Sequence, residues 1–185
     1  MKHSYWLKLL LFPSYKKSVL GLIKVSIDGE IEVLTTEAEG VKLGFPDGVV
    51  VAKNGMVYFT DGSYKYGYHE TMPCLLDGRP HGRLVSYDPL TKQTKVLARD
   101  LYFANGVELS PNQDFVIFCE SFMMRCSRYY LQGERKGSID VFIDGLPGFP
   151  DNLRYDGEGH YWLAIAWVIL FHTIRILILT TGFFN

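Results

Sequence analysis

The sequence has almost no net charge, few cysteines and no motif for nucleotide or zinc binding. Its 19 Lys and Arg residues nearly balance 20 Asp and Glu residues, which gives a formal net charge of -1. The basic residues are scattered, so no surface for nucleic acid is expected. The sequence lacks a glycine-rich phosphate loop, a Gly-x-Ser-x-Gly nucleophile elbow and the Cys/His spacing of a zinc site. Nucleic-acid partners and nucleotide or zinc chemistry are therefore not expected.

The three cysteines, Cys74, Cys119 and Cys126, leave at least one thiol without an internal partner. Cys119 and Cys126 are spaced to lie across a hairpin, where an oxidising compartment would allow a disulfide. Buried free thiols are the interpretation that we favour at this stage. The redox compartment stays open.

The two ends of the sequence differ from its middle. In residues 1–18, a short apolar run is interrupted by Lys8 and no small-residue cleavage site follows, so a signal peptide is not favoured. Residues 161–184 are almost continuously apolar and exceed the roughly 20 residues that cross a bilayer, but His172 and Arg175 lie near their centre. We favour a final strand over 161–166 and an apolar tail over 167–185. Membrane contact through that tail is the alternative.

One pattern occurs three times in the sequence. It runs Phe-x-Asp/Asn-Gly/Asn and continues into an alternating apolar strand, a turn and a second strand. The copies are Phe45-Pro46-Asp47-Gly48, Phe103-Ala104-Asn105-Gly106 and Phe149-Pro150-Asp151-Asn152, which begin 58 and 46 residues apart. Such spacings suit one four-stranded propeller blade per period, with an inserted loop over 64–82 in the longer one.

Alternating apolar residues and turn sequences predict six hairpins and no amphipathic helix. The paired strands expected are 19–27 with 31–34, 48–52 with 56–60, 83–87 with 94–98, 107–109 with 115–120, 126–131 with 139–143, and 153–155 with 160–164. The fold expected is all-β, with about three β-propeller blades in a domain over 19–166. Because a propeller loses its open edges only when its ring closes, we expect a fragment of a longer protein or a partner that supplies the missing faces.

An ordered series of motifs lies within residues 41–164, at 58–63, 82–89, 103–111 and 156–162. Together they resemble the characteristic region of plant strictosidine synthase-like proteins. The resemblance implies a six-bladed β-propeller, related to paraoxonases and gluconolactonases, of which this sequence would carry the middle blades.

The resemblance implies two possible chemistries. A strictosidine synthase joins an amine and an aldehyde in a Pictet-Spengler condensation, as in alkaloid biosynthesis, with an acid/base glutamate from a late blade that is not present in this sequence. The synthase also has a tyrosine at the position of Asp47 and glycines at those of Asn105 and Asp151. These differences favour the hydrolase side of the superfamily, in which Asn and Asp side chains of inner strands bind a divalent metal.

By that resemblance, Asn105, Asp151 and Asn152 match metal-ligand positions, and Asp47 stands where relatives place an Asn ligand. A further ligand of the relatives, a first-blade glutamate, precedes the start of this sequence. Amide and carboxylate oxygens suit a hard ion such as calcium, and a metal with open positions polarises an ester or lactone carbonyl. Alternatively, the three repeat residues are ordinary turn residues.

Two weaker candidates lie in the inserted loop. His81 and Tyr64 are placed to contact a substrate at a channel mouth, although a solvated histidine and an aromatic strand face explain them as well. Phe45, Phe103 and Phe149 are expected to pack between blades.

Three hypotheses follow for the function: a calcium-dependent lactonase or arylesterase, a synthase-type condensing enzyme, and an inactive truncated product. The first two take a small-molecule substrate. The resemblance also implies an endomembrane location, in the vacuole or the lumen of the endoplasmic reticulum.

Overall fold

A computed structural model describes residues 6–9 and 21–167 of the protein. The elements are β1 (Trp6–Leu9), β2 (Leu22–Val25), β3 (Ile31–Thr35), β4 (Glu37–Ala38), β5 (Val41–Lys42), β6 (Pro46–Val51), β7 (Val57–Asp61), the 3-10 helix η1 (Tyr68–Glu70), α1 (Thr71–Asp77), β8 (Gly82–Asp88), β9 (Gln93–Leu101), β10 (Ala104–Leu109), β11 (Phe115–Glu120), the 3-10 helix η2 (Ser121–Met123), β12 (Arg125–Tyr130), β13 (Ile139–Ile143), β14 (Phe149–Tyr155) and β15 (Tyr161–Trp167). Most of the N-terminal segment and the apolar tail beyond Trp167 lie outside the described residues. Within those residues, no helix has the length and apolar character needed to cross a membrane.

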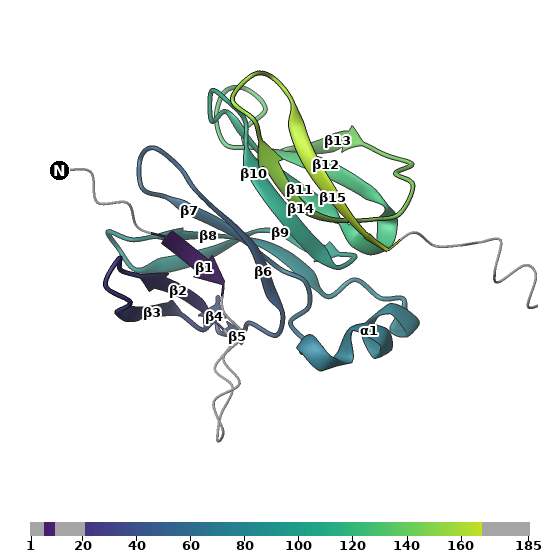
Figure 1. Ribbon diagram of the computed structural model, residues 1–185, viewed down its shortest axis with the longest axis horizontal. Helices are drawn as coiled ribbons and strands as arrows, with labels where there is room; N and C mark the ends of the chain where they lie inside the picture. The colour runs from purple at the N-terminus through teal and green to yellow at the C-terminus, as the bar shows by residue number, and fades with distance from the viewer. Residues whose placement is uncertain (1–5, 10–20, 168–185) are drawn as a thin grey trace, which may run out of the picture.

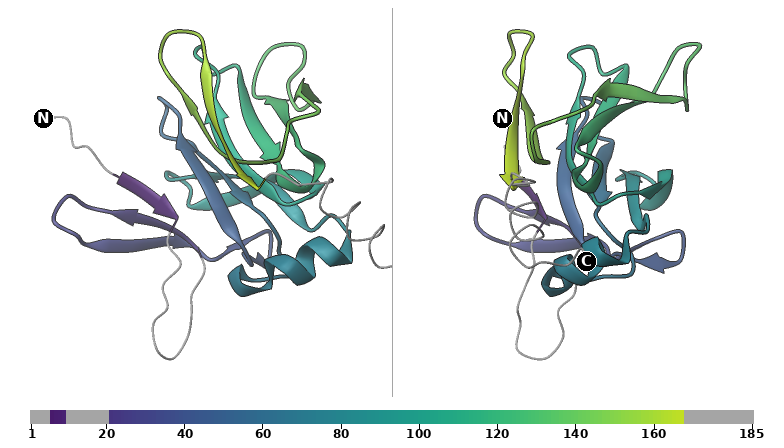
Figure 2. Two further views of the ribbon diagram at one scale, coloured as in Figure 1. Left: turned by 45° about the vertical axis from the view of Figure 1, so that its right-hand side comes forward. Right: turned by 90° about the vertical axis from the view of Figure 1, so that its right-hand side faces the viewer.

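The strands form successive antiparallel sheets. Two sheets are complete and four-stranded, β6-β7-β8-β9 and β10-β11-β12-β13, each in chain order. The three-stranded sheet β1-β2-β3 precedes them and the pair β14-β15 follows them, while β4 and β5 form a separate small ribbon. The first strands of successive sheets lie next to one another, because β10 contacts both β6 and β14 (Figures 1 and 2). This is the blade arrangement of a β-propeller, as the sequence predicted.

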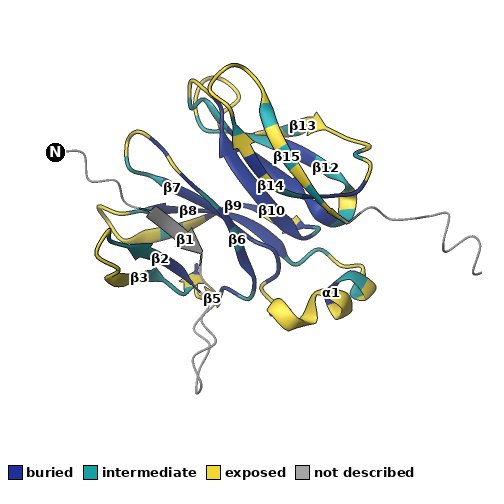
Figure 3. Ribbon diagram, in the orientation of Figure 1, coloured by how far each residue is buried: buried dark blue, intermediate teal, exposed yellow. Residues whose placement is uncertain are grey.

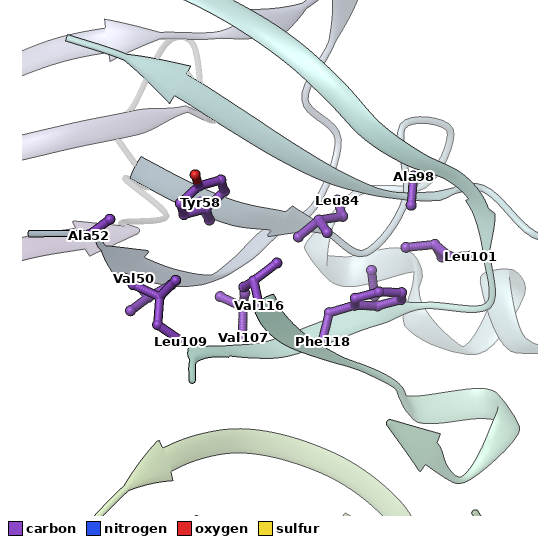
Figure 4. Close-up of a cluster of buried hydrophobic side chains, with 11 residues drawn as sticks. Val50, Ala52, Tyr58, Leu84, Ala98, Leu101, Val107, Leu109, Val116 and Phe118 are labelled. Atoms are coloured by element: carbon purple, nitrogen blue, oxygen red, sulfur yellow. The ribbon is translucent and has the colours of Figure 1, made fainter. Parts of the chain in front are cut away.

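The inner strands of each complete sheet bury both of their faces, while the outer strands β9 and β13 are partly exposed. Successive side chains of a strand point to opposite faces, so in β7 Tyr58 packs toward β10 and β11, while Val57 and Phe59 pack toward Leu22 of β2. Figure 4 shows the first of these clusters between the two four-stranded sheets. Figure 3 shows the buried residues concentrated on the strands that face neighbouring sheets. The blades are therefore stabilised mainly by apolar contact with their neighbours.

The three repeat motifs lie within the first strands of their sheets. In each strand the register to the second strand shifts at the motif, between Pro46 and Val49, Ala104 and Val107, and Pro150 and Leu153. Such β-bulges leave residues unpaired and change the direction of their side chains. Asp47, Asn105 and Asp151 are therefore bulge residues of strands and not the turn residues of the alternative interpretation.

The inserted segment 64–82 contains the helix α1, which the sequence analysis did not predict. The helix has seven residues and ends at Gly78, which has a φ of 63° and donates its N–H to the carbonyl of Leu75. A helix of two turns is too short to show a clear helical period of apolar residues in the sequence. Pro73 is tolerated in the first turn of a helix, but in a sequence it is more typical of a loop. The helix lies beyond the sheets at one end of the molecule (Figure 1).

Cys119 and Cys126 form a disulfide. They are directly opposite each other in the pairing of β11 with β12, and both are buried. The interpretation that we favoured, two free thiols, was therefore wrong. Cys74, in α1, is the buried free cysteine.

Candidate functional site

Three repeat residues meet at one cavity. Asp47, Asn105 and Asp151, from β6, β10 and β14, line a cavity of about 330 Å³, which we call the polar cavity. Its remaining walls are Phe45, Pro46, Tyr68, Thr71 and Phe103. Successive first strands therefore present equivalent oxygen-bearing side chains to one shared space, although their role as metal ligands stays a prediction.

The surroundings of Asp47 in the polar cavity disfavour its charged form. Burial, and then the charge of Asp151, raise the pKa of Asp47 from 3.8 to about 7. A bound cation reverses this effect, because it favours the ionised form of a carboxyl group. The electrostatics of the cavity thus suit a positive ion.

The amide of Asn105 is oriented by Ser121. Asn105 Nδ2 donates to Ser121 Oγ over 3.1 Å, and Ser121 Oγ donates its hydrogen to the carbonyl of Pro150 over 2.6 Å. Because the hydroxyl has one hydrogen, only its lone pairs face Asn105, so the NH2 group must lie on that side.

This orientation leaves Asn105 Oδ1 buried and without a hydrogen-bond partner. Among residues 21–166, whose side chains the structure describes, it is the sole buried side-chain nitrogen or oxygen atom in that condition. An unpaired buried acceptor is costly, and a cation would satisfy it. The residues present therefore fit an oxygen-ligated metal ion, although the described part of the chain has no group of three or more His, Cys, Asp or Glu side chains placed to hold one.

Asn152 lies outside the polar cavity. Its side chain is exposed, and its Nδ2 donates to Asp151 Oδ1 over 3.2 Å. The structure therefore brings together Asp47, Asn105 and Asp151, with Asn152 supporting the carboxylate of Asp151.

The glycines of the motif allow the first strands to approach each other. A Cβ atom on Gly106 would lie 2.2 Å from the carbonyl oxygen of Asp151, and one on Gly48 would lie 2.8 Å from that of Asn105. No side chain fits at such distances, so glycine is needed for this contact between strands. The contact is what places the three oxygen-bearing side chains at one cavity.

His81 and Tyr64 brace the inserted segment. His81 Nε2 lies 2.7 Å from Asp77 Oδ2, and His81 Nδ1 lies 3.4 Å from the hydroxyl of Tyr64. Hydrogen bonds from His81 and then Lys65 lower the pKa of Asp77 to about 2. These contacts join the C-terminal end of α1 to the start of β8, and neither His81 nor Tyr64 is a lining residue of the polar cavity. Their substrate-binding role stays a prediction.

A buried acid-arginine pair fixes the segment ahead of β6. Asp61, the last residue of β7, is fully buried and accepts from Arg83 Nη2 over 2.6 Å. It also accepts the N–H groups of Gly44 and Phe45, over 3.2 and 2.8 Å. Arg83 in turn donates to the carbonyl of Lys42 over 2.9 Å. The pair therefore holds the chain immediately before Asp47.

The next sheet, β10-β11-β12-β13, contains an equivalent acid-arginine pair. Glu120, the last residue of β11, accepts from Arg125 Nε over 2.8 Å and from the N–H of Tyr102 over 3.0 Å. In both sheets the acid lies directly opposite its arginine on the third strand. The sequence analysis missed these positioning residues. The signal was available as an acid at or directly after the end of each predicted second strand and an arginine at or directly before the start of the third.

A second, apolar cavity of about 300 Å³ adjoins the polar cavity. The two share Thr71, Phe103 and Asn105 as lining residues. The apolar cavity also has walls from Phe122 and Phe149, and Phe103 stacks on Phe122 with ring centroids 4.6 Å apart. Phe103 and Phe149 thus pack between blades, as predicted, and also face this space.

Comparison with known sequences identifies the family. A family model described as strictosidine synthase matches residues 47–134, which include the first two bulges. Over 146 residues the chain is 58% identical to Protein Strictosidine Synthase-Like 6 of Arabidopsis thaliana. The chain belongs to the strictosidine synthase-like family. The match covers 78% of the chain and 38% of that relative.

Animal proteins are also similar to this strictosidine synthase-like chain. It is 45% identical over 132 residues to the adipocyte plasma membrane-associated protein of Bos taurus, which covers 71% of the chain and 32% of that protein. The chain therefore spans less than two fifths of the length of these curated relatives.

Solved structures share the fold of this family member. A gluconolactonase of Xanthomonas campestris superposes with a TM-score of 0.62 at 18% identity, over 78% of the chain and 49% of that protein. Regucalcin of Agrobacterium tumefaciens, a calcium-binding protein, gives 0.58 at 21% identity, over 78% of the chain and 47% of that protein. These likenesses show the β-propeller fold.

Proposed function

We propose that this strictosidine synthase-like protein is a metal-dependent hydrolase of ester or lactone bonds. The observation that carries the proposal is the buried, unpaired Oδ1 of Asn105 at a cavity that also holds the carboxyl groups of Asp47 and Asp151. The resemblance gives a true synthase a tyrosine and two glycines at these three positions, whereas oxygen-bearing side chains suit a hydrolase with a metal ion.

The oxygen atoms favour calcium as the ion. One amide and two carboxyl groups from three strands form a hard, all-oxygen donor set, which suits calcium better than zinc or copper. When bound, such an ion would polarise the carbonyl group of an ester or lactone. Asn105 and Asp151 would hold such an ion, Asp47 would contact it in the ionised form, and Ser121 keeps the amide oxygen of Asn105 in place.

The similar structures add support for this proposal. One of them is described as a gluconolactonase and another as a calcium-binding protein. Membership in the strictosidine synthase-like family favours the alternative, a Pictet-Spengler condensation.

We also propose an oxidising endomembrane compartment, the lumen of the endoplasmic reticulum or the vacuole. The Cys119–Cys126 disulfide supports it, because such bonds persist in oxidising compartments. Similarity to a membrane-associated animal protein, the adipocyte plasma membrane-associated protein, also supports the endomembrane route.

Calcium titration by calorimetry tests the metal site. We expect the chain to bind calcium, Asn105→Ala and Asp151→Ala to weaken binding at least about 10-fold, and the control Asn112→Ala, at an exposed turn position outside the polar cavity, to retain it. Absence of binding by the unmodified chain, or equal loss in all three variants, would overturn the metal assignment.

Activity assays then separate the two chemistries. We expect hydrolysis of phenyl acetate or a simple lactone that stops when a chelator removes calcium. Condensation of tryptamine with an aldehyde, without ester hydrolysis, would favour the synthase alternative.

A further inference from the structure

We propose that the apolar cavity binds the uncharged hydrocarbon part of the substrate, and that Leu75 of α1 sets the size of the group accepted. The inference rests on the proposed function, whose polar cavity would hold the reacting carbonyl group. It names a substrate class: aryl or alkyl esters and lactones in place of polyhydroxylated sugar lactones.

The two cavities are continuous at three residues. Thr71, Phe103 and Asn105 line both of them, so Asn105 lies at their boundary. A molecule whose carbonyl group lies near Asn105 and Asp151 has the apolar cavity as the adjoining space for its remaining atoms.

The walls of the apolar cavity are unsuited to charged or hydroxylated groups. No Asp, Glu, Lys, Arg or His is among its lining residues. Its two hydroxyl groups are already committed, since Thr71 donates to the carbonyl of Tyr68 and Ser121 to that of Pro150. A sugar hydroxyl entering this space would lose water without gaining a full set of partners, which is unfavourable.

Aromatic rings supply the attraction for a hydrocarbon group. Phe122 lies between Phe103 and Phe149, with centroid distances of 4.6 and 5.6 Å. Aromatic side chains favour offset or edge contacts with a further ring. A cavity of roughly 150 Å³ holds benzene, so about 300 Å³ accommodates a two-ring group.

One face of α1 closes the cavity. Thr71 and Leu75 are one helical turn apart, Met72 lies beside them, and all three are lining residues. Cys74 is buried against Phe45 and Phe103, which holds the helix in place. Leu76 is on another face of the helix and is 79% exposed. Leu75 and Leu76 are therefore a matched pair for the same substitution.

Calorimetric titration with 2-naphthol, in the presence of a chelator, tests the inference without metal or catalysis. We expect the full 185-residue chain to bind 2-naphthol, Leu75→Trp to weaken binding at least 10-fold by filling the cavity, and Leu76→Trp to leave it within twofold. Met72→Trp, at a half-exposed position, is a second filling variant should Leu75→Trp not fold, and we expect it to weaken binding as well.

The outcomes distinguish this inference from the proposed function. Three results would overturn the inference about the apolar cavity. They are no binding of 2-naphthol, equal loss of 2-naphthol affinity in Leu75→Trp and Leu76→Trp, and displacement of 2-naphthol by gluconolactone. If the contrast between Leu75 and Leu76 holds while calcium binding and hydrolysis are absent, the pocket stands and the hydrolase assignment falls.

Discussion

At the scale of single residues, repetition made the site predictable. Asp47, Asn105 and Asp151 occupy equivalent places in three copies of one motif, and the structure brings them to one cavity. The sequence did not separate Asp151 from Asn152, because neighbouring residues at a bulge point in different directions. Nor did it reveal the role of Ser121, since a hydrogen bond across 16 residues leaves no local pattern.

The raised pKa of Asp47 predicts a pH-dependent stability. Between about pH 4 and 7 the folded, ion-free chain holds a proton on Asp47 that the unfolded chain releases, so the free energy of unfolding falls as pH rises through this window. Asn cannot titrate. We therefore expect the free energy of unfolding of Asp47→Asn to rise by about 2–3 kcal/mol relative to that of the unmodified chain between pH 5 and 8, in urea unfolding with a chelator present.

Asp156 provides a control of opposite sign. Hydrogen bonds from the backbone of Glu158 and His160 lower its pKa, so its contribution to stability is present at neutral pH and lost on acidification. Asp156→Asn should therefore be less stable than the unmodified chain at pH 7, with the difference shrinking toward pH 3. The same pH trend in both variants would contradict the assignment for Asp47.

At the scale of elements, strands were predictable and charged pairs were not. Turn sequences such as Asp28-Gly29 and Asn54-Gly55 marked hairpins that the structure confirms, β2-β3 and β6-β7. Alternation of apolar residues shows which face of a strand is buried, but not which buried acid meets which arginine. For that reason the Asp61–Arg83 and Glu120–Arg125 pairs emerged only from the structure.

Burial predicts different costs for the two pairs. The Arg83 side chain is 2% exposed and that of Arg125 is 30% exposed. Removing one partner of a buried pair leaves an uncompensated charge, so we expect Arg83→Met to lower the free energy of unfolding by about 3–5 kcal/mol. Arg125→Met should cost about 1–2 kcal/mol, because the Arg125 position is already partly exposed and water can approach the buried carboxylate of Glu120 once the guanidinium is removed. Urea unfolding measures both.

A double variant separates charge from shape. Combining Asp61→Asn with Arg83→Met removes the uncompensated negative charge of Asp61. The double variant should therefore recover part of the free energy of unfolding that Arg83→Met alone loses. Equal losses for Arg83→Met and Arg125→Met would mean that burial does not govern these pairs.

At the scale of the whole molecule, the close contact between first strands determines whether the blades meet. The sequence predicted the order of the blades from the repeat spacing. It did not show why the motif carries glycine in two copies and Asn152 in the third. The structure explains the two glycines by the neighbouring backbone that passes within van der Waals distance of each.

We predict that Gly106→Ala separates the blades that carry Asn105 and Asp151. Its Cβ atom would lie 2.2 Å from the carbonyl oxygen of Asp151, and overpacking against rigid backbone costs about 3 kcal/mol. Urea unfolding should show this loss, and calcium binding should weaken with it. Gly67→Ala is the control, since it has a φ of −90° and only the Glu70 side chain, at 3.6 Å, near the new atom. A comparable loss at Gly67 would contradict this explanation.

The Cys119–Cys126 bond joins β11 to β12 beside the residues Glu120 and Arg125. Recombinant protein made in a bacterial cytosol would leave this cross-link unformed, so that backbone pairing and the ion pair alone would join the two strands at that end of the blade. Preparations for the assays above should therefore come from a periplasmic or eukaryotic secretory host, and reducing agents should be kept out of the buffers.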